Sequence, residues 1–399
     1  MTAQTGVSHD FIVRRFLILF FALILGISTW ICQAKPKPKP QINQEQKNAG
    51  FRQLFANVFS EWDRNHDGKL DLKEVNTVIE NPQIHGNESA IAVVFHRHLQ
   101  TDDDEKTNGL TLAQVLSLAD DPEIQKSVSG KAWHIEAINH SLFAPGDPNL
   151  ATFHQGGIGD CYLLAVIGTF VYQHPQTVRT MIQPQADGTF QVHFGNGKNV
   201  KVEPMTDAEL IMGASEGRAH GVWLSVLEKA YARIDAEAKE RKTGEEIESD
   251  DAVTTDFIGH GGYYGPVIVL LTGHKAAGAP LGRWVKQDSK AGIEKAHELL
   301  AKLSSEHKLM AVLTGKDKTR PLPKGIVHGH IFGVLGYDAA RRMVVVFNPW
   351  GNHVKPAGPP GLVNGYPTQH GVFEVPLGEF IQIFGGFTYE TDKPAATAH

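Results

Sequence analysis

The segment Gln155–Ala165 reads QGGIGDCYLLA and places glycines and Asp160 directly before a run of apolar residues. Glycines favour a loop and Asp is a preferred helix N-cap, so the pattern predicts a loop that becomes a helix at Cys161. Unpaired N–H groups and the helix dipole stabilise a thiolate at such a position. The other cysteine, Cys32, lies near the N-terminus. The sequence therefore predicts a reactive thiol at Cys161 in place of a disulfide.

The first 34 residues have the pattern of an export segment. Arg14 and Arg15 precede the apolar run Phe16–Ile31, and Cys32-Gln33-Ala34 follows it like a small-x-small cleavage site. Export with cleavage after Ala34 predicts a secreted or periplasmic chain that begins near Lys35, which N-terminal sequencing would show. A membrane anchor through residues 16–31 is the alternative, because the run is only slightly shorter than the ~20 residues of a membrane-spanning helix.

The composition is that of a globular protein with more than one compact unit. The chain has 399 residues, of which 41% are hydrophobic and 21% charged, and its net charge of −6 gives no basic surface for nucleic acid. Residues 35–50 form a linker that starts with alternating lysine and proline, which is stiff and extended.

Residues 51–125 are predicted to form an all-α calcium-binding module. Phe51, Phe55, Phe59 and Trp62 share one face of a helix that leads into the twelve-residue segment Asp63–Glu74. This segment resembles an EF-hand loop, with Gly68 at the tight turn and a bidentate carboxylate at the last position. The candidate Ca²⁺ ligands are Asp63, Asn65, Asp67, the Lys69 carbonyl, Asp71 and Glu74.

A second, degenerate hand is expected at residues 103–114. Aligning Leu110 with Leu70 puts Gln114 in place of the closing glutamate and displaces the glycine by one residue, to Gly109. Both changes weaken calcium binding, which favours a structural pseudo-hand over a second calcium site.

Residues 131–391 are predicted to mix helices and strands. A cysteine nucleophile needs a base and an orienting group, and His330 opens one predicted strand while Asn348 ends the next. With a loop at residues 338–340, these two residues would lie directly opposite each other, close enough for a side-chain hydrogen bond. His328 is the competing base, but it does not meet Asn348 in this register. The Gln155 amide and the Cys161 N–H can serve an oxyanion; alone, Gln155 would be an ordinary loop residue.

Three motifs resemble those of calpain-type cysteine proteases: Gln155–Ala165, Gly329-His330 and Asn348-Pro-Trp-Gly351. Further family blocks are Trp223–Tyr231, Asp256–Gly259 and Gly371–Phe380. The resemblance covers residues 135 to 391 and implies an α+β fold with a papain-like, two-lobed core and a substrate cleft between the lobes. It also implies Cys161 as the nucleophile, His330 as the base and acid, Asn348 as the orienter and Gln155 as the oxyanion donor.

The chain departs from the family pattern in three respects. Tyr162 replaces the usual tryptophan, Ile331-Phe332 replaces Ala-Tyr, and the calcium module precedes the protease core instead of following it. Calcium ligands in the core are not assigned; the acidic run at residues 245–251 is one candidate, and a solvated loop is the other reading.

The sequence thus predicts a calcium-responsive cysteine endopeptidase that acts on proteins or peptides through an acyl-enzyme. The alternatives are a catalytically silent calcium-dependent binding module and an acyltransferase that uses the same three residues.

Overall fold

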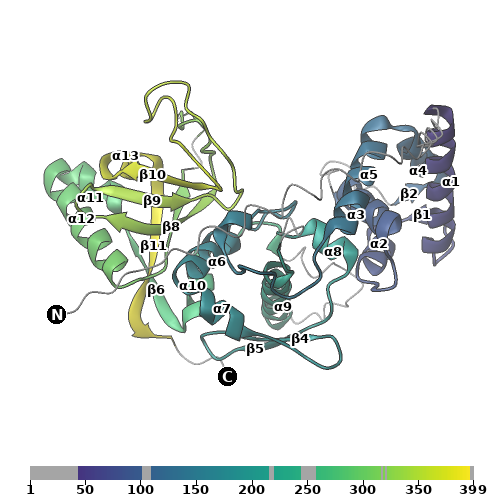
Figure 1. The fold of residues 1–399 in the computed structure, drawn as a ribbon, viewed down its shortest axis with the longest axis horizontal. Coiled ribbons are helices and arrows are strands. Elements are labelled where there is room, and N and C mark those ends of the chain that lie inside the picture. Colours follow the sequence, from purple (N-terminus) through teal and green to yellow (C-terminus); the bar gives the residue numbers. More distant parts are fainter. Residues whose placement is uncertain are drawn as a thin grey trace, which may run out of the picture. The chain divides into compact units, whose positions relative to one another are not determined.

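The computed structural model describes residues 44–100, 109–214, 220–243, 258–315, 318–319 and 321–395 (Figure 1). The chain divides into two compact units, Met1–Lys47 and Asn48–His399. The expected export or anchor segment at residues 1–34 lies outside the described residues, as do most of the linker and the acidic run at residues 245–251. Among the residues that are described, no helix has the length and apolar character needed to span a membrane.

The N-terminal part of the described chain is helical, as expected. Two very short strands pair antiparallel, with Leu70 opposite Leu110, which is the correspondence predicted between the two loops. Phe55 and Phe95 meet edge to face at 5.3 Å in the core between the helices. The elements are α1 (Gln44–Trp62), β1 (Lys69–Leu70), α2 (Leu72–Ile79), α3 (Gly86–Gln100), β2 (Leu110–Thr111), α4 (Leu112–Asp120) and α5 (Pro122–Ala137).

One helix crosses the expected boundary between the module and the protease core. The sequence predicted a module that ends near residue 125 and a core that starts at 131, whereas α5 is continuous from Pro122 to Ala137. Asp121 caps its N-terminus and Pro122 occupies the first turn, where a missing N–H is harmless. The helix therefore packs on α3 and α4 of the module and also on α8 (Asp207–Met212).

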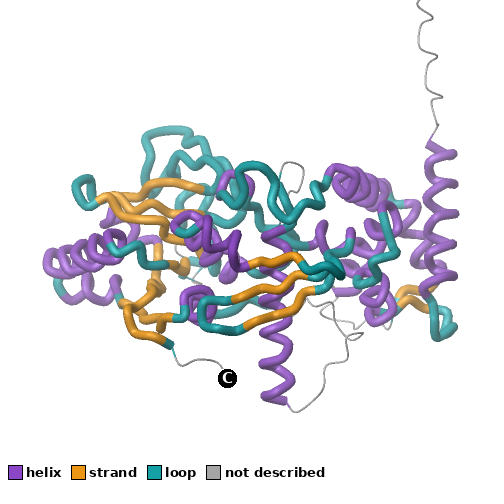
Figure 2. Tube along the Cα trace, turned by 60° about the horizontal axis from the view of Figure 1, so that its bottom comes forward, coloured by secondary structure: helices purple, strands orange, loops and turns teal. Residues whose placement is uncertain are grey.

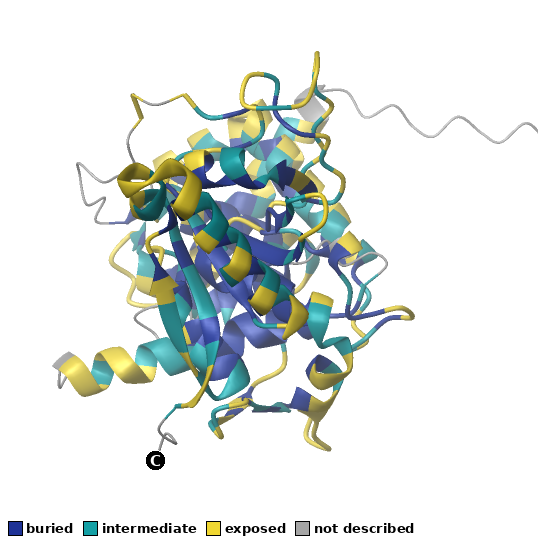
Figure 3. Ribbon diagram, turned by 90° about the vertical axis from the view of Figure 1, so that its left-hand side faces the viewer, coloured by how far each residue is buried: buried dark blue, intermediate teal, exposed yellow. Residues whose placement is uncertain are grey.

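The next part of the chain surrounds a buried helix, α6 (Cys161–Gln173), whose residues 162 to 171 are all buried. Figure 3 shows in dark blue how the buried residues gather in the interior. A small antiparallel sheet of β3, β4 and β5 follows in the chain, and strands are drawn in orange in Figure 2. Its β4–β5 hairpin turns around Asn196-Gly197, which is a common pair of turn residues. The elements are η1 (Leu150–Thr152), α7 (Pro175–Met181), β3 (Ile182–Pro184), β4 (Phe190–His193), β5 (Asn199–Val202), α8 (Asp207–Met212), α9 (Trp223–Thr243) and α10 (Tyr264–Thr272).

The C-terminal part is built on a six-stranded antiparallel sheet in the order β10-β9-β8-β7-β11-β6. Helix α6 packs against β8, and α12 packs against β8 as well. The elements are β6 (His274–Ala279), α11 (Leu281–Gln287), α12 (Ser289–Ser305), β7 (Met310–Thr314), β8 (Ile331–Asp338), β9 (Met343–Phe347), β10 (Val372–Pro376), α13 (Leu377–Ile383) and β11 (Phe384–Pro394).

Two hydrophobic clusters divide the interior among the described residues. The first runs without a break from the helical module, through Phe55 and Phe95, to the nucleophile helix α6 and to Phe347. The second lies within the six-stranded sheet and its helices and includes Phe332 and Phe380. Since the module and α6 share one cluster, the module packs on the core as part of the same hydrophobic interior.

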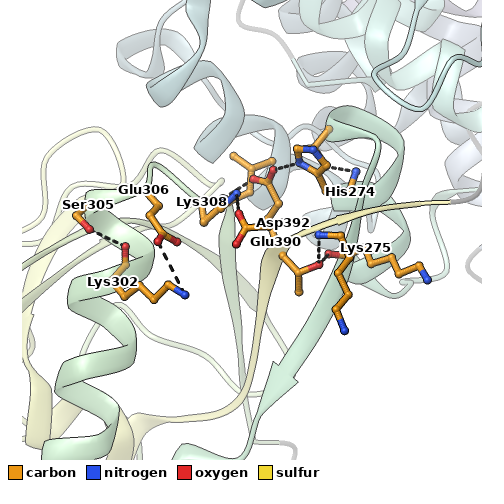
Figure 4. A network of polar contacts seen from close by, with 12 residues as sticks. His274, Lys275, Lys302, Ser305, Glu306, Lys308, Glu390 and Asp392 are labelled. Atoms are coloured by element: carbon orange, nitrogen blue, oxygen red, sulfur yellow. Dashed lines mark hydrogen bonds and ion pairs between the residues drawn. The ribbon is translucent and has the colours of Figure 1, made fainter.

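A polar network joins the last strand to the elements beside it (Figure 4). Glu390 on β11 pairs with His274 Nδ1 at 2.6 Å and accepts the Leu309 N–H at 3.1 Å. Lys308 pairs with Asp392 at 2.6 Å. These contacts hold the start of β6 and the start of β7 to β11, which completes the sheet.

Candidate active site

Cys161 is the first residue of α6, as predicted, and the free cysteine of the described chain. Asp160 occupies the N-cap position, but its side chain makes no capping hydrogen bond. Burial raises the pKa of the Cys161 thiol, the Ile331 N–H lowers it, and the charge of Asp160 raises it further. The structure therefore does not favour the thiolate that the sequence predicted. Removal of the thiol from water raises its pKa by more than the backbone N–H donors lower it.

The side chains of His330 and Asn348 are hydrogen bonded, with His330 Nε2 2.9 Å from Asn348 Oδ1. Both residues are buried, and Asn348 is fully inaccessible to solvent. The ring of Trp350 lies 4.4 Å from the His330 ring, centroid to centroid. Burial lowers the pKa of His330, while the bond to Asn348 raises it. The imidazole is therefore held neutral and in a fixed orientation.

The Asn348 contacts decide the tautomer of His330. Asn348 Oδ1 also accepts the backbone N–H of Trp350 at 3.1 Å, so this atom is an acceptor toward both partners. An acceptor requires the proton of the imidazole to sit on Nε2. Nδ1 then carries the lone pair and can take a proton from a thiol.

The strand register that brings these two residues together differs from the prediction. Asp338 pairs with Met343, so the loop is residues 339–342 instead of 338–340. An irregularity between Val334 and Gly336 then shifts the register by one, which leaves Gly333 opposite Phe347. His330 and Asn348 are consequently not directly opposite. Both lie just beyond their strands, and their side chains meet across the end of the sheet.

His328 is engaged elsewhere. Its Nδ1 lies 3.1 Å from the Gly315 carbonyl oxygen, in the loop before β8. His330, in contrast, is fixed through its backbone by Thr314, whose hydroxyl accepts the His330 N–H at 3.0 Å and whose N–H donates to the His330 carbonyl. Thr314 was not identified from the sequence, where a threonine at the end of an apolar strand carries no signal.

Gln155 is buried beside the Cys161 loop and links two parts of the site. Its backbone N–H donates to the Pro349 carbonyl at 2.8 Å, next to Asn348. Its side-chain Nε2 donates to the Ile158 carbonyl at 2.7 Å. The Gln155 side chain also acts as a hydrogen-bond donor to Asp160, which lowers the pKa of that carboxyl. Gln155 therefore ties the Cys161 loop together.

Two carboxyl groups lie together beneath the nucleophile loop. Asp160 and Glu228, on α9, are both buried, and Glu228 Oε2 accepts the Ala214 N–H at 2.6 Å. Burial raises the pKa of Asp160 to about 7, which the Glu228 side chain partly offsets, and burial with the charge of Asp160 raises the pKa of Glu228 well above its usual range. The pair therefore keeps protons near neutral pH. A charged residue inside the apolar segment Trp223–Tyr231 was the available sequence signal for Glu228.

The pair makes stability depend on pH. At pH 5 to 7 the folded chain holds protons on these carboxyls that the unfolded chain releases, so stability falls as pH rises through about 7. We expect the free energy of unfolding to fall less steeply with rising pH in Glu228→Gln. The slope should be smaller by up to about 1.4 kcal/mol per pH unit for each proton removed. Urea unfolding of both chains from pH 5 to 8 measures it. Glu237→Gln, exposed on the same helix, is the control, and an unchanged slope in Glu228→Gln would contradict the assignment.

The loop Asp63–Glu74 has features that suit a calcium ion. Gly68, with φ +82°, donates its N–H to Asp63 Oδ2 at 3.1 Å, and Asp63 Oδ1 is buried without a hydrogen-bond partner among the described residues. Glu74 accepts the Arg64 N–H at 2.8 Å and the Asp71 N–H at 3.2 Å. The described residues gather no cluster of three or more acidic, His or Cys side chains arranged to hold a metal.

The second loop begins outside the described residues, but its exit matches the first. Thr111 and Gln114 form a capping box, as Asp71 and Glu74 do. A Cβ on Gly109 would lie 2.9 Å from the Leu70 carbonyl oxygen, so glycine is needed where the two loops meet. Gln114 therefore takes the position that Glu74 has in the first loop, but without a charge.

Helix α8 connects the helical module to the nucleophile loop by hydrogen bonds. Thr206, its N-cap, donates through Oγ1 to the carbonyl of Ile79, the last residue of α2, at 2.6 Å. At the other end of α8, the Met212 carbonyl accepts the Gly157 N–H at 3.1 Å. A shift of α2 would thus act on the loop that precedes Cys161.

Comparison with known proteins places this arrangement in a family. The model of the calpain family cysteine protease matches residues 113–359, more than half of the chain. The chain belongs to the calpain family. It is 23% identical to calpain-9 of Rattus norvegicus over 236 residues, which are 54% of this chain and 30% of the relative. It is 25% identical to the calpain-type cysteine protease DEK1 of Arabidopsis thaliana over 224 residues, 54% of this chain and 10% of the relative. The chain thus spans less than a third of the relatives it matches.

The departures from the calpain motifs are accommodated by local packing. Tyr162 packs edge to face on Tyr231 at 6.0 Å, and a Cβ on Gly262 would lie 2.6 Å from the Tyr162 ring. Phe332 packs against His330 at 4.8 Å. An aromatic side chain therefore packs beside the nucleophile helix and beside the histidine at these two positions.

A cavity of about 1080 Å³ lies at the other end of α6. Apolar residues such as Tyr172, Pro175 and Val345 line it, together with polar ones that include Glu374 and Glu379. Cys161, His330 and Asn348 do not line it. This cavity is therefore separate from Cys161, which lies at the N-terminus of α6.

Proposed function

We propose that this chain is a calcium-responsive cysteine endopeptidase with a papain-like, two-lobed core. It cleaves protein or peptide substrates with Cys161 as nucleophile, His330 as base and acid, and Asn348 as orienting residue. The observation that carries the proposal is the buried hydrogen bond from His330 Nε2 to Asn348 Oδ1, which leaves Nδ1 unprotonated. The contact of the Cys161 sulfur with the Ile331 N–H puts the thiol beside the residue that follows His330.

The reaction follows from the protonation state. Both the raised pKa of Cys161 and the lowered pKa of His330 favour a neutral thiol and imidazole. His330 Nδ1 takes the thiol proton as the sulfur attacks the substrate carbonyl, and the imidazolium then gives this proton to the leaving amine. Water attacks the thioester with His330 again as base, releasing the acid and restoring the thiol. The Cys161 N–H and the Gln155 side-chain amide stabilise the oxyanion.

The calcium response is assigned to the helical module, which we infer to be an EF-hand pair with one functional site. Asp63, Asn65, Asp67, Asp71, Glu74 and the Lys69 carbonyl would hold Ca²⁺. The ion supplies positive charge that ties both helices to the loop. The hydrogen bonds from Ile79 through α8 to Gly157 support a route from this loop to the nucleophile.

Glu74→Gln tests the calcium site. Loss of the closing carboxylate should weaken Ca²⁺ binding by about tenfold or more. It should also remove calcium-dependent stabilisation, which is about 2.7 kcal/mol at a hundredfold excess over Kd. Calorimetric titration and thermal unfolding measure both effects, and Glu123→Gln, exposed on α5, is the control. Undiminished Ca²⁺ binding in Glu74→Gln would refute the EF-hand.

Cleavage of casein or a peptide library by the purified 35–399 chain, with and without calcium, tests the activity. A calcium requirement that survives Glu74→Gln would belong to the protease lobes. Binding of peptides without cleavage would favour a silent binding module, and transfer of the acyl group to an added amine would favour an acyltransferase. We propose that the protein works outside the cytoplasm, on the basis of the pattern at residues 14–34.

A further inference from the structure

The large cavity at the far end of α6 exists because this helix covers only part of the sheet. A Cβ on Gly168, in the middle of α6, would lie 2.3 Å from the Phe347 ring, so helix and sheet are in direct contact there. Alternate residues of a strand share one face, which puts Val345 and Met343 on the same face of β9 as Phe347. Both line the cavity, together with Tyr172 near the end of α6. The sheet thus continues past the helix, and this part of its face is open to the cavity.

The edge strand β10 extends the same wall. Val345 lies opposite Glu374 and Met343 lies opposite Pro376, so the four side chains share one face of the sheet. All four line the cavity. The side chains that alternate with them, such as Val375, are buried in the hydrophobic cluster on the other face. One face of this strand pair is therefore packed, and the other forms a wall of the cavity.

Two segments that lead to the active site also line the cavity. Residues 148–151 line it and continue along the chain to Gln155. Residues 366–370, in the loop before β10, line it as well and are followed by Gly371, whose carbonyl accepts the Asn348 N–H at 2.8 Å. The volume of about 1080 Å³ lies at the upper end of the ~300–1,000 Å³ of small-molecule sites. A ligand of this size would contact the sheet and the segment before the nucleophile loop at the same time.

The composition of the lining favours an apolar ligand. Tyr172 is 57% exposed, so its ring is accessible to a ligand. Prolines recur in the lining and lack the backbone N–H that binds anions in other sites. The prolines among the described lining residues are Pro148, Pro175, Pro360, Pro367 and Pro376. The lining therefore suits an apolar body and disfavours an anionic group.

The charged side chains of the lining are acidic. None of the described residues that line the cavity is a lysine or an arginine, whereas Glu374 and Glu379 both line it. Arg341 donates two hydrogen bonds to Glu374, at 2.8 and 3.2 Å, and balances its charge. Glu379 has no ion pair with another described residue, and its Oε2 accepts the Tyr366 hydroxyl at 2.5 Å. Burial and the Glu379 carboxylate raise the pKa of Tyr366, so this hydroxyl keeps its proton. A carboxylate has further acceptor positions, which leaves Glu379 able to bind a cation.

We propose that this cavity is a binding site for a small amphipathic cation, an apolar molecule with a protonated amine that donates to the Glu379 carboxylate. The apolar body lies against Met343 and Val345 of the sheet and the ring of Tyr172. The charge-assisted hydrogen bond orients the ligand, as a few polar groups do in sites that are otherwise apolar. Binding at this site requires neither the protease activity nor calcium.

The test uses the full chain and three biphenyl probes of similar shape that differ in their head group: biphenylmethylamine, biphenylmethanol and biphenylcarboxylate. Calorimetric titration at pH 7 should show saturable binding of one amine per chain. We expect the alcohol to bind about tenfold more weakly than the amine and the carboxylate more weakly still, with a smaller difference between amine and alcohol at high salt. Equal affinity for the three probes, or no saturable binding of the amine, would overturn the proposal.

Substitutions locate the bound amine. In Glu379→Gln the amine should lose its advantage over the alcohol, because the amide keeps an acceptor for Tyr366 and removes the negative charge. Tyr172→Ala should weaken amine and alcohol alike by about tenfold, since it removes a ring from the wall. Glu298→Gln, exposed on α12 and outside the lining, is the matched control, and carbamidomethylation of Cys161 should leave amine binding unchanged. An amine preference that persists in folded Glu379→Gln, unchanged binding in Tyr172→Ala, or loss of binding on modification of Cys161 would refute the site.

Discussion

Cys161→Ala should lower kcat for peptide cleavage by about 10⁴-fold or more, because it removes the nucleophile that forms the acyl-enzyme. The change removes a single sulfur atom at the start of α6, where the side chain is half-buried. Folding should therefore be nearly unaffected. Initial rates with a fluorogenic peptide, together with urea unfolding of the same sample, measure both effects.

Chemical modification provides the matched experiment for this prediction. Iodoacetamide should label one site in the 35–399 chain and abolish cleavage, while Cys161→Ala should not be labelled. The Cys161→Ser chain has a side chain of similar volume in which a hydroxyl replaces the thiol. His330 activates a hydroxyl less readily than a thiol, so cleavage should be lost in this chain too. Full activity in either substituted chain would disprove the cysteine protease mechanism.

His330→Ala should be nearly as damaging, with a loss of about 10⁴-fold in kcat, because no other described group takes the thiol proton. His328→Ala is the matched control, since the same residue type is removed two positions away in the same segment. Its imidazole is bonded to the Gly315 carbonyl, so we expect activity within about threefold of the wild type. Steady-state kinetics on both chains make the comparison.

Asn348→Ala should lower kcat by about 10²-fold, a loss between those of His328→Ala and His330→Ala. The orienting residue fixes a tautomer of His330 and takes no part in bond making. Its loss also leaves His330 Nε2 without an acceptor in a buried position, which costs stability. If His328→Ala were the inactivating change and His330→Ala the mild one, the assignment of the base would be wrong. In that case the hydrogen bond to Asn348 would be structural.

Much of the secondary structure could be predicted because the local signals are strong. Short continuous apolar runs predict the strands Met310–Thr314 and Met343–Phe347, and the structure has strands with these bounds. The apolar run after Cys161 gave the buried helix. In each case neighbouring residues in the sequence supply the signal, and the element needs no distant contact to be recognised.

The hairpin register was predicted wrongly because it depends on the turn. Arg342 adopts φ +54°, and the Arg341 N–H bonds to Asp338 Oδ1, so the turn extends over residues 339–342. The later irregularity near Leu335 shifts the register again. The turn has no Gly or Pro to mark it in the sequence. Gly336 borders the irregularity, but a glycine inside a strand does not by itself fix a register. The contact of His330 with Asn348 nevertheless forms, because long side chains at the strand ends can reach each other diagonally.

The sequence by itself determined the kinds of residue at the site, the order in which they occur and the helices and strands that carry them. Only the tertiary structure decided their electrostatic state. Burial beneath the Cys161 loop, produced by contacts between α6, α9 and β8, raises the pKa of the thiol and holds protons on Asp160 and Glu228. Desolvation depends on residues that lie far apart in the chain and meet only when it folds, so no local pattern in the sequence reveals it.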